Sequence, residues 1–262
     1  MKKLLMCVPT HFQVTYDINP WMTTNIGLVD NVKATKQWDK LFDEITKYSI
    51  VNVIETVEEC PDLVFTANAG FTQDNIAILS RFKSKERQKE EIIFHKWFLS
   101  KDYQVYQPKN TYEGAGDHLV DKLNRHWLGT GFRTDKQVKE ELEQVLNVNI
   151  NLLELVDPRW YHLDTCFCPL PNGEILWYPN AFTEESRKLI DRSFKFSIEI
   201  SEEDALMFAC NCVGLQDHLF LPKGTEVQRS LRAIGYAVHE FDLDEFIKAG
   251  GAAKCLVLNL SK

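Results

Sequence analysis

The chain has 262 residues, of which 44% are apolar and 26% charged, a composition typical of a folded globular protein. Its formal net charge of -8 and isoelectric point near 5.4 argue against a nucleic-acid-binding surface, which needs clustered lysine and arginine. An acidic protein of this kind can still attract a small cationic substrate. No apolar run approaches the about 18 residues of a membrane span, and no signal-peptide cleavage site follows the short apolar N-terminus.

The seven cysteines are an odd number in a chain large enough to fold without disulfides. We therefore expect reduced thiols and a cytoplasmic setting. Two pairs have C-x-C spacing, 166 with 168 and 210 with 212, whereas zinc sites typically use wider spacing. Packed core thiols are the favoured interpretation, and no metal site is expected.

Short apolar runs alternate with amphipathic helical patterns along the whole chain. The expected strands are 4–8, 51–54, 64–65, 75–79, 105–106, 118–120, 126–129, 152–155, 165–170, 174–178, 218–221, 237–241 and 255–260. The expected helices are 34–48, 83–99, 134–146, 183–193, 201–207, 224–234 and 243–248, with Thr183 and Ser201 as N-caps. This alternation predicts an α/β fold.

No Pro-, Gly- or Ser-rich linker divides the chain, so we expect one catalytic domain over residues 1–262. A set of strands with a helix recurs about every 50 residues, which is compatible with a repeated module. The sequence has no GxGxxG motif after a strand and no Walker A loop. A nucleotide-binding fold therefore has no support.

Five segments place polar or reactive side chains beside small residues or short apolar runs. They are 62–70 with Asn68, 113–117 with Glu113 and Asp117, 128–134 with Arg133, 161–165 with His162 and Asp164, and 249–258 with Cys255. Each segment has an ordinary structural interpretation as a turn, a helix cap, a paired histidine on one side of a strand or a packed thiol. Together they supply the nucleophile, acid–base group, carboxylates and arginine needed to attack a guanidinium carried by an amino acid.

The chain resembles the guanidino-group-modifying enzymes of the pentein superfamily, and most closely the arginine dihydrolase domain of cyanobacterial type. The resemblance runs in order through residues 16–22 (YDINPWM), 62–70 (DLVFTANAG), 79–82 (LSRF), 113–117 (EGAGD), 131–133 (GFR), 161–170 (YHLDTCFCPL), 210–211 and 248–255 (KAGGAAKC). It covers essentially the whole chain. It implies an α/β propeller of five ββαβ modules around a central active site.

The resemblance also implies roles for individual residues. Cys255 would attack the guanidinium carbon to form a covalent thiouronium intermediate, and His162 would serve as acid and base. Glu113 and Asp164 would bind the guanidinium and orient His162. The remaining matching residues would bind substrate, with the arginines near its α-carboxylate: Asn19, Asn68, Arg81, Arg133 and Asp117. No metal or organic cofactor is implied.

The number of hydrolytic steps depends on Asn68, where related deiminases carry an aspartate. A neutral amide would let the enzyme retain neutral citrulline for a second attack, so we expect conversion of free arginine to ornithine, ammonia and carbon dioxide. The alternatives are a dimethylarginine or arginine hydrolase that stops at citrulline, and an amidinotransferase. A non-catalytic arginine-binding protein is disfavoured, because a binder has no need of a reactive thiol.

The expected partner is a small-molecule substrate, with no nucleic acid and no membrane. The sequence leaves the oligomeric state open. Longer relatives carry a second, C-terminal domain, and we expect any activity housed there to be missing from this sequence.

Overall fold

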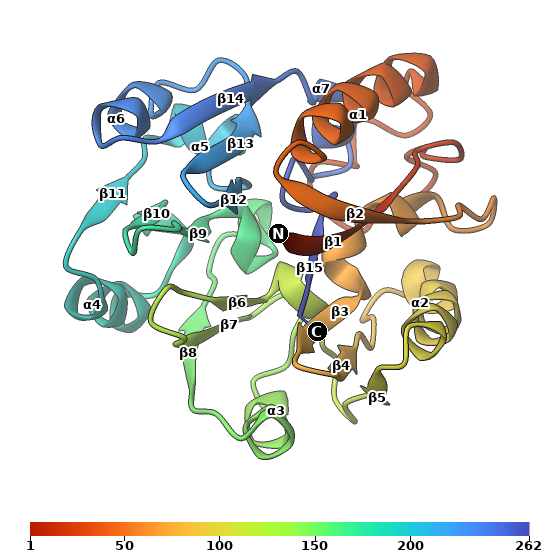
Figure 1. The fold of residues 1–262 in the computed structure, drawn as a ribbon, viewed down its shortest axis with the longest axis horizontal. Helices are drawn as coiled ribbons and strands as arrows, with labels where there is room; N and C mark the ends of the chain where they lie inside the picture. Colours follow the sequence, from red (N-terminus) through yellow and green to blue (C-terminus); the bar gives the residue numbers. More distant parts are fainter. Residues whose placement is uncertain (262) are drawn as a thin grey trace.

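The structure is a computed structural model that describes residues 1–261. Five three-stranded sheets surround the centre of the molecule like the blades of a propeller (Figure 1). Their strand orders are β15 (Leu258–Leu260), β1 (Lys2–Cys7), β2 (Ser49–Ile54); β3 (Gly70–Gln73), β4 (Ile76–Leu79), β5 (Gln104–Tyr106); β6 (His118–Val120), β7 (His126–Thr130), β8 (Ile150–Glu154); β9 (Phe167–Pro169), β10 (Ile175–Trp177), β11 (Ser197–Glu199); and β12 (Val213–Leu215), β13 (His218–Pro222), β14 (Ala237–Phe241).

All five sheets have the same internal arrangement. The middle strand pairs antiparallel with the first strand and parallel with the third. A parallel pair needs a crossover, and a helix supplies it in each module: α1 (Asn31–Ile45), α2 (Gln88–Ser100), α3 (Val138–Leu146), α4 (Glu184–Ser193) and α6 (Gln228–Ala233). The expected five ββαβ modules are therefore confirmed. Because β15 pairs with β1, the last strand of the chain completes the first sheet and closes the ring.

The expected helices are present, with shorter bounds at several ends. Besides the five crossover helices, the predicted short helices at 201–207 and 243–248 are present in the connections as α5 (Glu202–Leu206) and α7 (Asp244–Ile247). Thr183 and Ser201 cap α4 and α5 as predicted, since each side chain accepts a hydrogen bond from a backbone N–H in the first helical turn. Within residues 1–261, no helix combines the length and apolar character needed to cross a membrane.

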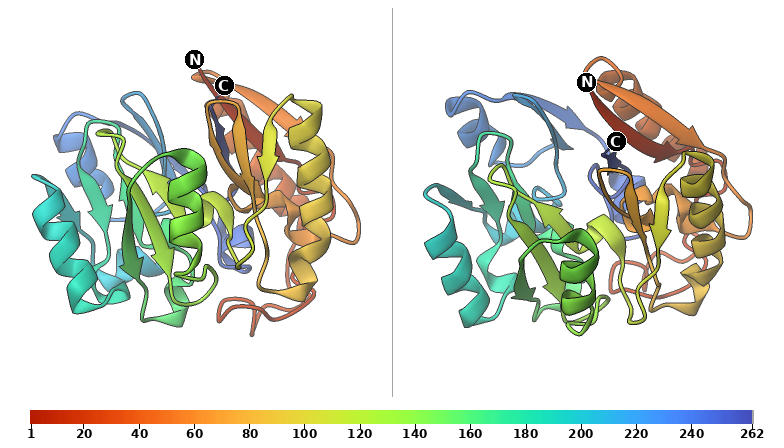
Figure 2. Two further views of the ribbon diagram at one scale, coloured as in Figure 1. Left: turned by 90° about the horizontal axis from the view of Figure 1, so that it is seen from below. Right: turned by 60° about the horizontal axis from the view of Figure 1, so that its bottom comes forward.

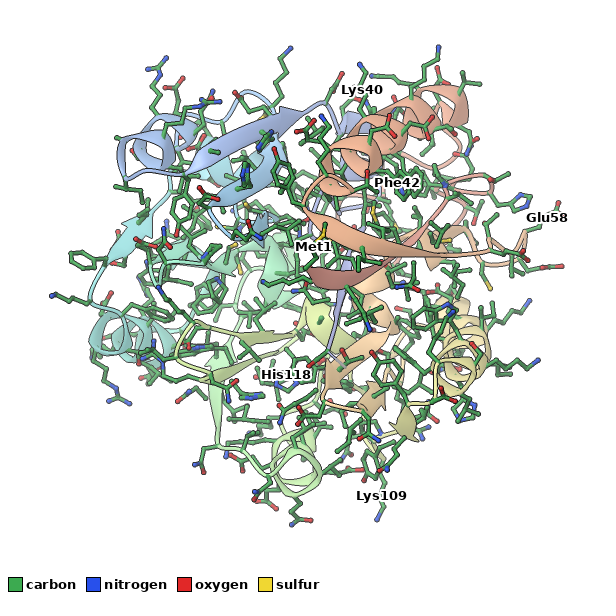
Figure 3. All side chains as sticks on the ribbon, viewed as in Figure 1. Met1, Lys40, Phe42, Glu58, Lys109 and His118 are labelled. Carbon is green, nitrogen blue, oxygen red and sulfur yellow. The ribbon has the colours of Figure 1, made fainter. Side chains whose placement is uncertain are left out.

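Large apolar side chains fill the space between the sheets and helices (Figure 3). The most deeply buried include Trp127, Trp160 and Trp177, which belong to one cluster that spans the third, fourth and fifth modules. All seven cysteines are buried and unpaired, as expected for packed thiols.

Three short strands lack a clear apolar pattern and escaped prediction: β3, β11 and β12. Three sequence predictions were wrong in a way that matters for the site. Residues 64–65 form no strand, because the chain from Pro61 to Ala69 makes two successive 3₁₀ turns. His162 and Asp164 do not share a strand face, because residues 163–165 form another 3₁₀ turn. Cys255 precedes the last strand within a turn and does not belong to it.

These turns have a common position in the fold. In each module, the segment just before the first strand reaches the centre of the molecule, and there it carries a polar or reactive residue. The five residues, in the order of the modules, are Cys255 before β15, Asn68 before β3, Glu113 before β6, Asp164 before β9 and Asn211 before β12. The fivefold repetition of the fold thus gathers five side chains from distant parts of the sequence.

One glycine shows how closely these segments approach one another. Gly114 has φ of +61°, and a Cβ atom built on it would lie 2.7–2.8 Å from the backbone of Gly70. Only glycine fits both the left-handed backbone and the contact. The turn of the third module therefore packs directly against the backbone of the second, which places Glu113 beside Asn68.

Candidate active site

The thiol of Cys255 is held between an amide and a carboxylate. Asn211 donates a hydrogen bond from Nδ2 to Sγ at 3.1 Å, and its Oδ1 accepts one from the backbone N–H of Cys255 at 3.1 Å. On the other side, Sγ lies 3.5 Å from Oδ2 of Asp164. Burial raises the pKa of Cys255 well above its ordinary value, and the charge of Asp164 raises it further. The thiol is therefore protonated in the free protein.

Asp164 is itself fully enclosed. Burial raises its pKa to about 6, although the nearby charge of Lys254 and the thiol hydrogen bond oppose the increase. Near neutral pH, most molecules carry an ionised Asp164 beside a protonated thiol. A cation bound next to this pair would stabilise both the carboxylate and the thiolate, because each negative form gains a nearby positive charge.

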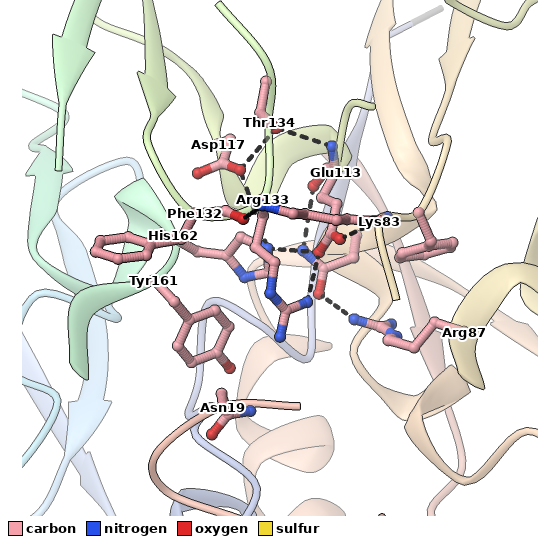
Figure 4. A network of polar contacts seen from close by, with 12 residues as sticks. Asn19, Lys83, Arg87, Glu113, Asp117, Phe132, Arg133, Thr134, Tyr161 and His162 are labelled. Atoms are coloured by element: carbon pink, nitrogen blue, oxygen red, sulfur yellow. Dashed lines mark hydrogen bonds and ion pairs between the residues drawn. The ribbon is translucent and has the colours of Figure 1, made fainter. Parts of the chain in front are cut away.

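Glu113, His162 and Arg133 form a second buried group (Figure 4). Oε2 of Glu113 accepts hydrogen bonds from Arg133 Nη1 at 2.9 Å and contacts His162 Nε2 at 2.7 Å. Burial alone would raise the pKa of Glu113, but Arg133 and His162 outweigh it and lower the pKa. Burial lowers the pKa of His162 to about 4 against the opposing effect of Glu113. Glu113 is thus a carboxylate, and His162 is a neutral imidazole that can accept a proton.

Asp117 supports the segments that carry this group. Its two oxygens accept hydrogen bonds from the hydroxyl of Thr134 at 2.7 Å and from the backbone N–H of Leu163 at 3.0 Å. Its Oδ2 lies 4.0 Å from Nε2 of His162. Asp117 therefore fixes the turn that carries His162, while Glu113 holds the imidazole itself.

Asn68 is fixed at both ends of its side-chain amide. Nδ2 donates to the backbone carbonyl of Glu113 at 3.1 Å, and Oδ1 accepts from Nη1 of Arg87 at 2.8 Å. Arg87 in turn makes a two-pronged ion pair with Glu90, at 2.9 and 2.8 Å. This pair is almost completely buried. Since Arg87 can only donate hydrogen bonds, it determines which end of the Asn68 amide is the oxygen.

A small enclosed cavity of about 10 Å³ separates these groups, which is room for about one water molecule. It is lined by Cys255, Asn68, Arg87 and Arg133 and by Ile18, Asn19, Met22, Asp62, Phe65, Tyr161, Ala249 and Gly251. Residues 18–22 close one side of it. This segment is tied down by hydrogen bonds from Arg133 to the Ile18 carbonyl at 2.8 Å and from Asn19 to the Ala249 carbonyl at 3.1 Å.

Four of the predicted site residues line this cavity: Cys255, Asn19, Asn68 and Arg133. Glu113 and Asp164 do not line it but contact Arg133 and Cys255, and His162 and Asp117 lie behind Glu113. Arg81 does not line the cavity, because its side chain turns aside and Nε donates to the Pro108 carbonyl at 2.5 Å. Arg87, Asp62 and Tyr161 line the cavity but were not singled out from the sequence as site residues. Arg87 and Glu90 are three residues apart within a charged stretch, and the same spacing is common for exposed pairs on a helix surface, so the sequence held no signal of their burial. Within residues 1–261, no group of His, Cys, Asp and Glu side chains has the geometry of a metal site.

Comparison with known proteins agrees with this arrangement. A family model described as N,N-dimethylarginine dimethylhydrolase, eukaryotic, matches residues 22–262. The chain belongs to the dimethylarginine dimethylaminohydrolase family. It is 35% identical to the N(G),N(G)-dimethylarginine dimethylaminohydrolase of Mycobacterium tuberculosis, over 99% of this chain and 86% of that protein.

Two cyanobacterial members are more similar in sequence. The bifunctional arginine dihydrolase/ornithine cyclodeaminases of Nostoc sp. and Synechocystis sp. are 44% and 41% identical over 99% of this chain. The chain spans 38% of the length of each. The crystal structure of the N-terminal domain of ArgZ, an arginine dihydrolase bound to its substrate, superimposes with a TM-score of 0.98 at 40% identity, covering 100% of this chain and 99% of that one. The expected resemblance to the dihydrolase domain and the pentein fold is thereby confirmed.

Proposed function

We propose that this protein is a cysteine-dependent hydrolase that converts free arginine to ornithine, two molecules of ammonia and carbon dioxide. The observation that carries the proposal is the position of Cys255 Sγ, between Asp164 and Asn211 at the wall of a cavity that also contains Asn68, an amide. The 0.98 TM-score match to the dihydrolase domain of ArgZ supports the same activity. The cavity as it stands is smaller than arginine, so residues 18–22 must move to admit the substrate.

In the first half of the reaction, Asp164 and Glu113 bind the guanidinium cation. The substrate's positive charge lowers the pKa of Cys255, and the resulting thiolate attacks the guanidinium carbon. A terminal nitrogen leaves as ammonia after protonation by His162, which passes on the proton released by the thiol. His162 then accepts a proton from water, which displaces the sulfur and leaves citrulline.

In the second half, the same thiol attacks the ureido carbon of citrulline and expels a second ammonia. Water releases the thiocarbamate as N-carboxyornithine, which loses carbon dioxide to give ornithine. Asn68 favours this second step, because it presents no extra negative charge that would hold arginine better than neutral citrulline. Citrulline therefore stays bound long enough to react.

The α-carboxylate of the substrate lies beside Arg133 and Arg87 in this proposal. Both guanidinium groups line the cavity, and a planar fork of N–H donors suits a carboxylate. Arg81 was predicted for the same role, but it would first have to leave the Pro108 carbonyl. Asn19 supports the cavity wall by its bond to Ala249, and Asp117 acts through His162.

The test is to incubate the purified protein with arginine and to measure ammonia, citrulline and ornithine over time. Two ammonia and one ornithine per arginine are expected, with loss of activity in Cys255→Ala. Accumulation of citrulline as the end product would refute the two-step reaction. No consumption of arginine would refute the proposal as a whole.

The family match favours one further candidate, hydrolysis of dimethylarginine to citrulline and dimethylamine. The same assay with asymmetric dimethylarginine, followed by detection of dimethylamine, separates the two. We also infer that the protein works in the cytoplasm, since all seven cysteines are unpaired and a reducing compartment keeps thiols in that form.

A further inference from the structure

The molecule contains a second, larger hollow on the far side of Cys255. This central cavity has a volume of about 550 Å³ and is lined by residues from the first strands of all five sheets: β15, β3, β6, β9 and β12. Lys2, Asn259 and Ser261 line it too, so it lies toward the face that carries both termini. Figure 1 looks onto this face, with both termini near the middle, and Figure 3 labels Met1 and the cavity residue His118 there. In Figure 2 (left) the red loop before α1 lies at the opposite end of the molecule.

The central cavity comes close to the sulfur of Cys255 at Asp164. Asp164 lines the cavity and also lies 3.5 Å from Sγ of Cys255. The side chain of Asp164 therefore contacts both the cavity and the thiol. The small enclosed cavity is lined by Cys255 itself and by residues 18, 19 and 22, so Cys255 lies between the two cavities.

Lysines predominate among the charged side chains of the central cavity. Three lysines line the central cavity: Lys2, Lys122 and Lys254. Of its two carboxylates, Asp121 is paired with Arg125 at 2.6 Å, which leaves Asp164 at the inner end. A cationic wall repels arginine and ammonium but not neutral molecules. The central cavity is therefore unsuited to substrate entry and suited to small neutral species.

The chemistry requires such a route. Two waters must enter and two ammonia molecules must leave while the amino acid stays bound between the two steps. The amino acid itself occupies the small cavity once residues 18–22 have moved to enlarge it. We propose that the central cavity carries water to Cys255 and ammonia and carbon dioxide away from it, while the amino acid occupies the opposite side. This inference rests on the proposed function.

Lys254 stands at the inner end of this route. Its ammonium lies 3.5 Å from the Ala115 carbonyl and 3.4 Å from the Val257 carbonyl. No carboxylate of residues 1–261 lies within ion-pair distance of it, so its charge is not cancelled by a direct partner. Ammonia passes it as the neutral molecule and takes up a proton from solvent after leaving.

The test uses substitutions on two different strands that narrow the central cavity. Leu119 on β6 and Cys168 on β9 both line it. Leu119→Trp and Cys168→Trp are the two blocking variants, and Leu119→Phe is a milder third. Leu123→Trp is the matched control, because Leu123 is 71% exposed and lies outside the cavity. Circular dichroism and thermal unfolding establish that each variant is folded.

The first readout needs no enzymatic activity. Hydrogen peroxide is a neutral molecule little larger than water. It oxidises the Cys255 thiol to sulfenic acid and is itself reduced to water. A dimedone-type reagent traps the sulfenic acid, and peptide mass spectrometry measures how much of Cys255 is modified over time. The blocking variants should slow oxidation of Cys255 about tenfold relative to Leu123→Trp, an added barrier of about 1.4 kcal/mol. Folded blocking variants that oxidise at the control rate would overturn the proposal.

The second readout is turnover of arginine. The blocking variants should lower kcat without raising KM, and the covalent adduct on Cys255 should accumulate, because its hydrolysis waits for water. An unchanged kcat in a folded blocking variant would also overturn the proposal. If the unmodified protein consumes no arginine, the proposed function fails, and the peroxide rates still decide whether the cavity leads to Cys255.

Discussion

Replacing Asn68 by aspartate tests the feature that sets a two-step reaction apart from a one-step reaction. The carboxylate keeps one acceptor for Arg87, which donates to Asn68 Oδ1 at 2.8 Å. It cannot donate to the Glu113 carbonyl, which accepts from Asn68 Nδ2 at 3.1 Å. The second oxygen of the new carboxylate is repelled by that carbonyl and turns toward the cavity that Asn68 lines.

The consequence is a preference for the cationic substrate. A carboxylate about 4 Å from a guanidinium, at an effective dielectric constant of about 20, contributes about 4 kcal/mol that neutral citrulline cannot gain. This corresponds to about a thousandfold preference for arginine over citrulline. The lost hydrogen bond costs about 1–3 kcal/mol of stability, because the buried Glu113 carbonyl keeps no side-chain donor there.

We therefore expect Asn68→Asp to release citrulline and to yield one ammonia per arginine where the unmodified protein yields two. The assay is a time course of ammonia, citrulline and ornithine at saturating arginine. Asn149→Asp is the matched control, since Asn149 is exposed and the substitution adds the same charge. Two ammonia per arginine from Asn68→Asp, at the rate of the unmodified protein, would refute the reasoning.

Three further changes test the surroundings of the thiol. Asn211→Ala leaves the backbone N–H groups of residues 252 and 255 without their acceptor. The free energy of unfolding, measured in urea, should fall by about 4 kcal/mol, at about 2 kcal/mol for each donor. A decrease below about 1 kcal/mol would contradict this. The pKa of Asp164 is raised to about 6, so its charge is lost as pH falls below that value, and kcat/KM for arginine should decline there. A profile that stays flat down to about pH 5 would show that this carboxylate does not bind the cation. In Gly251→Ala, the new Cβ would lie 2.6 Å from the ring of Phe65 and 3.1 Å from Cβ of Cys255. We therefore expect a lower kcat and a decrease of about 1–3 kcal/mol in the free energy of unfolding. An unchanged kcat and melting temperature would show that the turn accommodates a methyl group without strain.

The sequence by itself determined the class of fold and most of its elements. Apolar runs and helical periodicity located the crossover helices and most of the middle and third strands, because these elements bury one continuous face. Caps at Thr183 and Ser201 were also readable, since capping depends on a few neighbouring residues. The ordered motifs around Cys255, His162 and Glu113 identified the family.

Tertiary structure decided how those motifs work. The segments 61–69 and 163–165 are 3₁₀ turns, which have no periodic pattern that distinguishes them from the strands predicted at 64–65 and 165–170. Such turns bring their residues to the centre only because five similar modules close into a ring. The neighbours of Cys255 come from turns 91 and 44 residues away in sequence, at Asp164 and Asn211.

Burial decided the roles of individual residues, which the sequence pattern alone did not indicate. Arg87 was part of a charged helical stretch in the sequence, whereas the fold encloses it with Glu90 and aims it at Asn68. Arg81 appeared in a family motif, yet its side chain points to Pro108. Local pattern fixes which groups a chain carries, but distance, desolvation and pairing between modules exist only after folding, and these decide the protonation of Cys255 and its access to water.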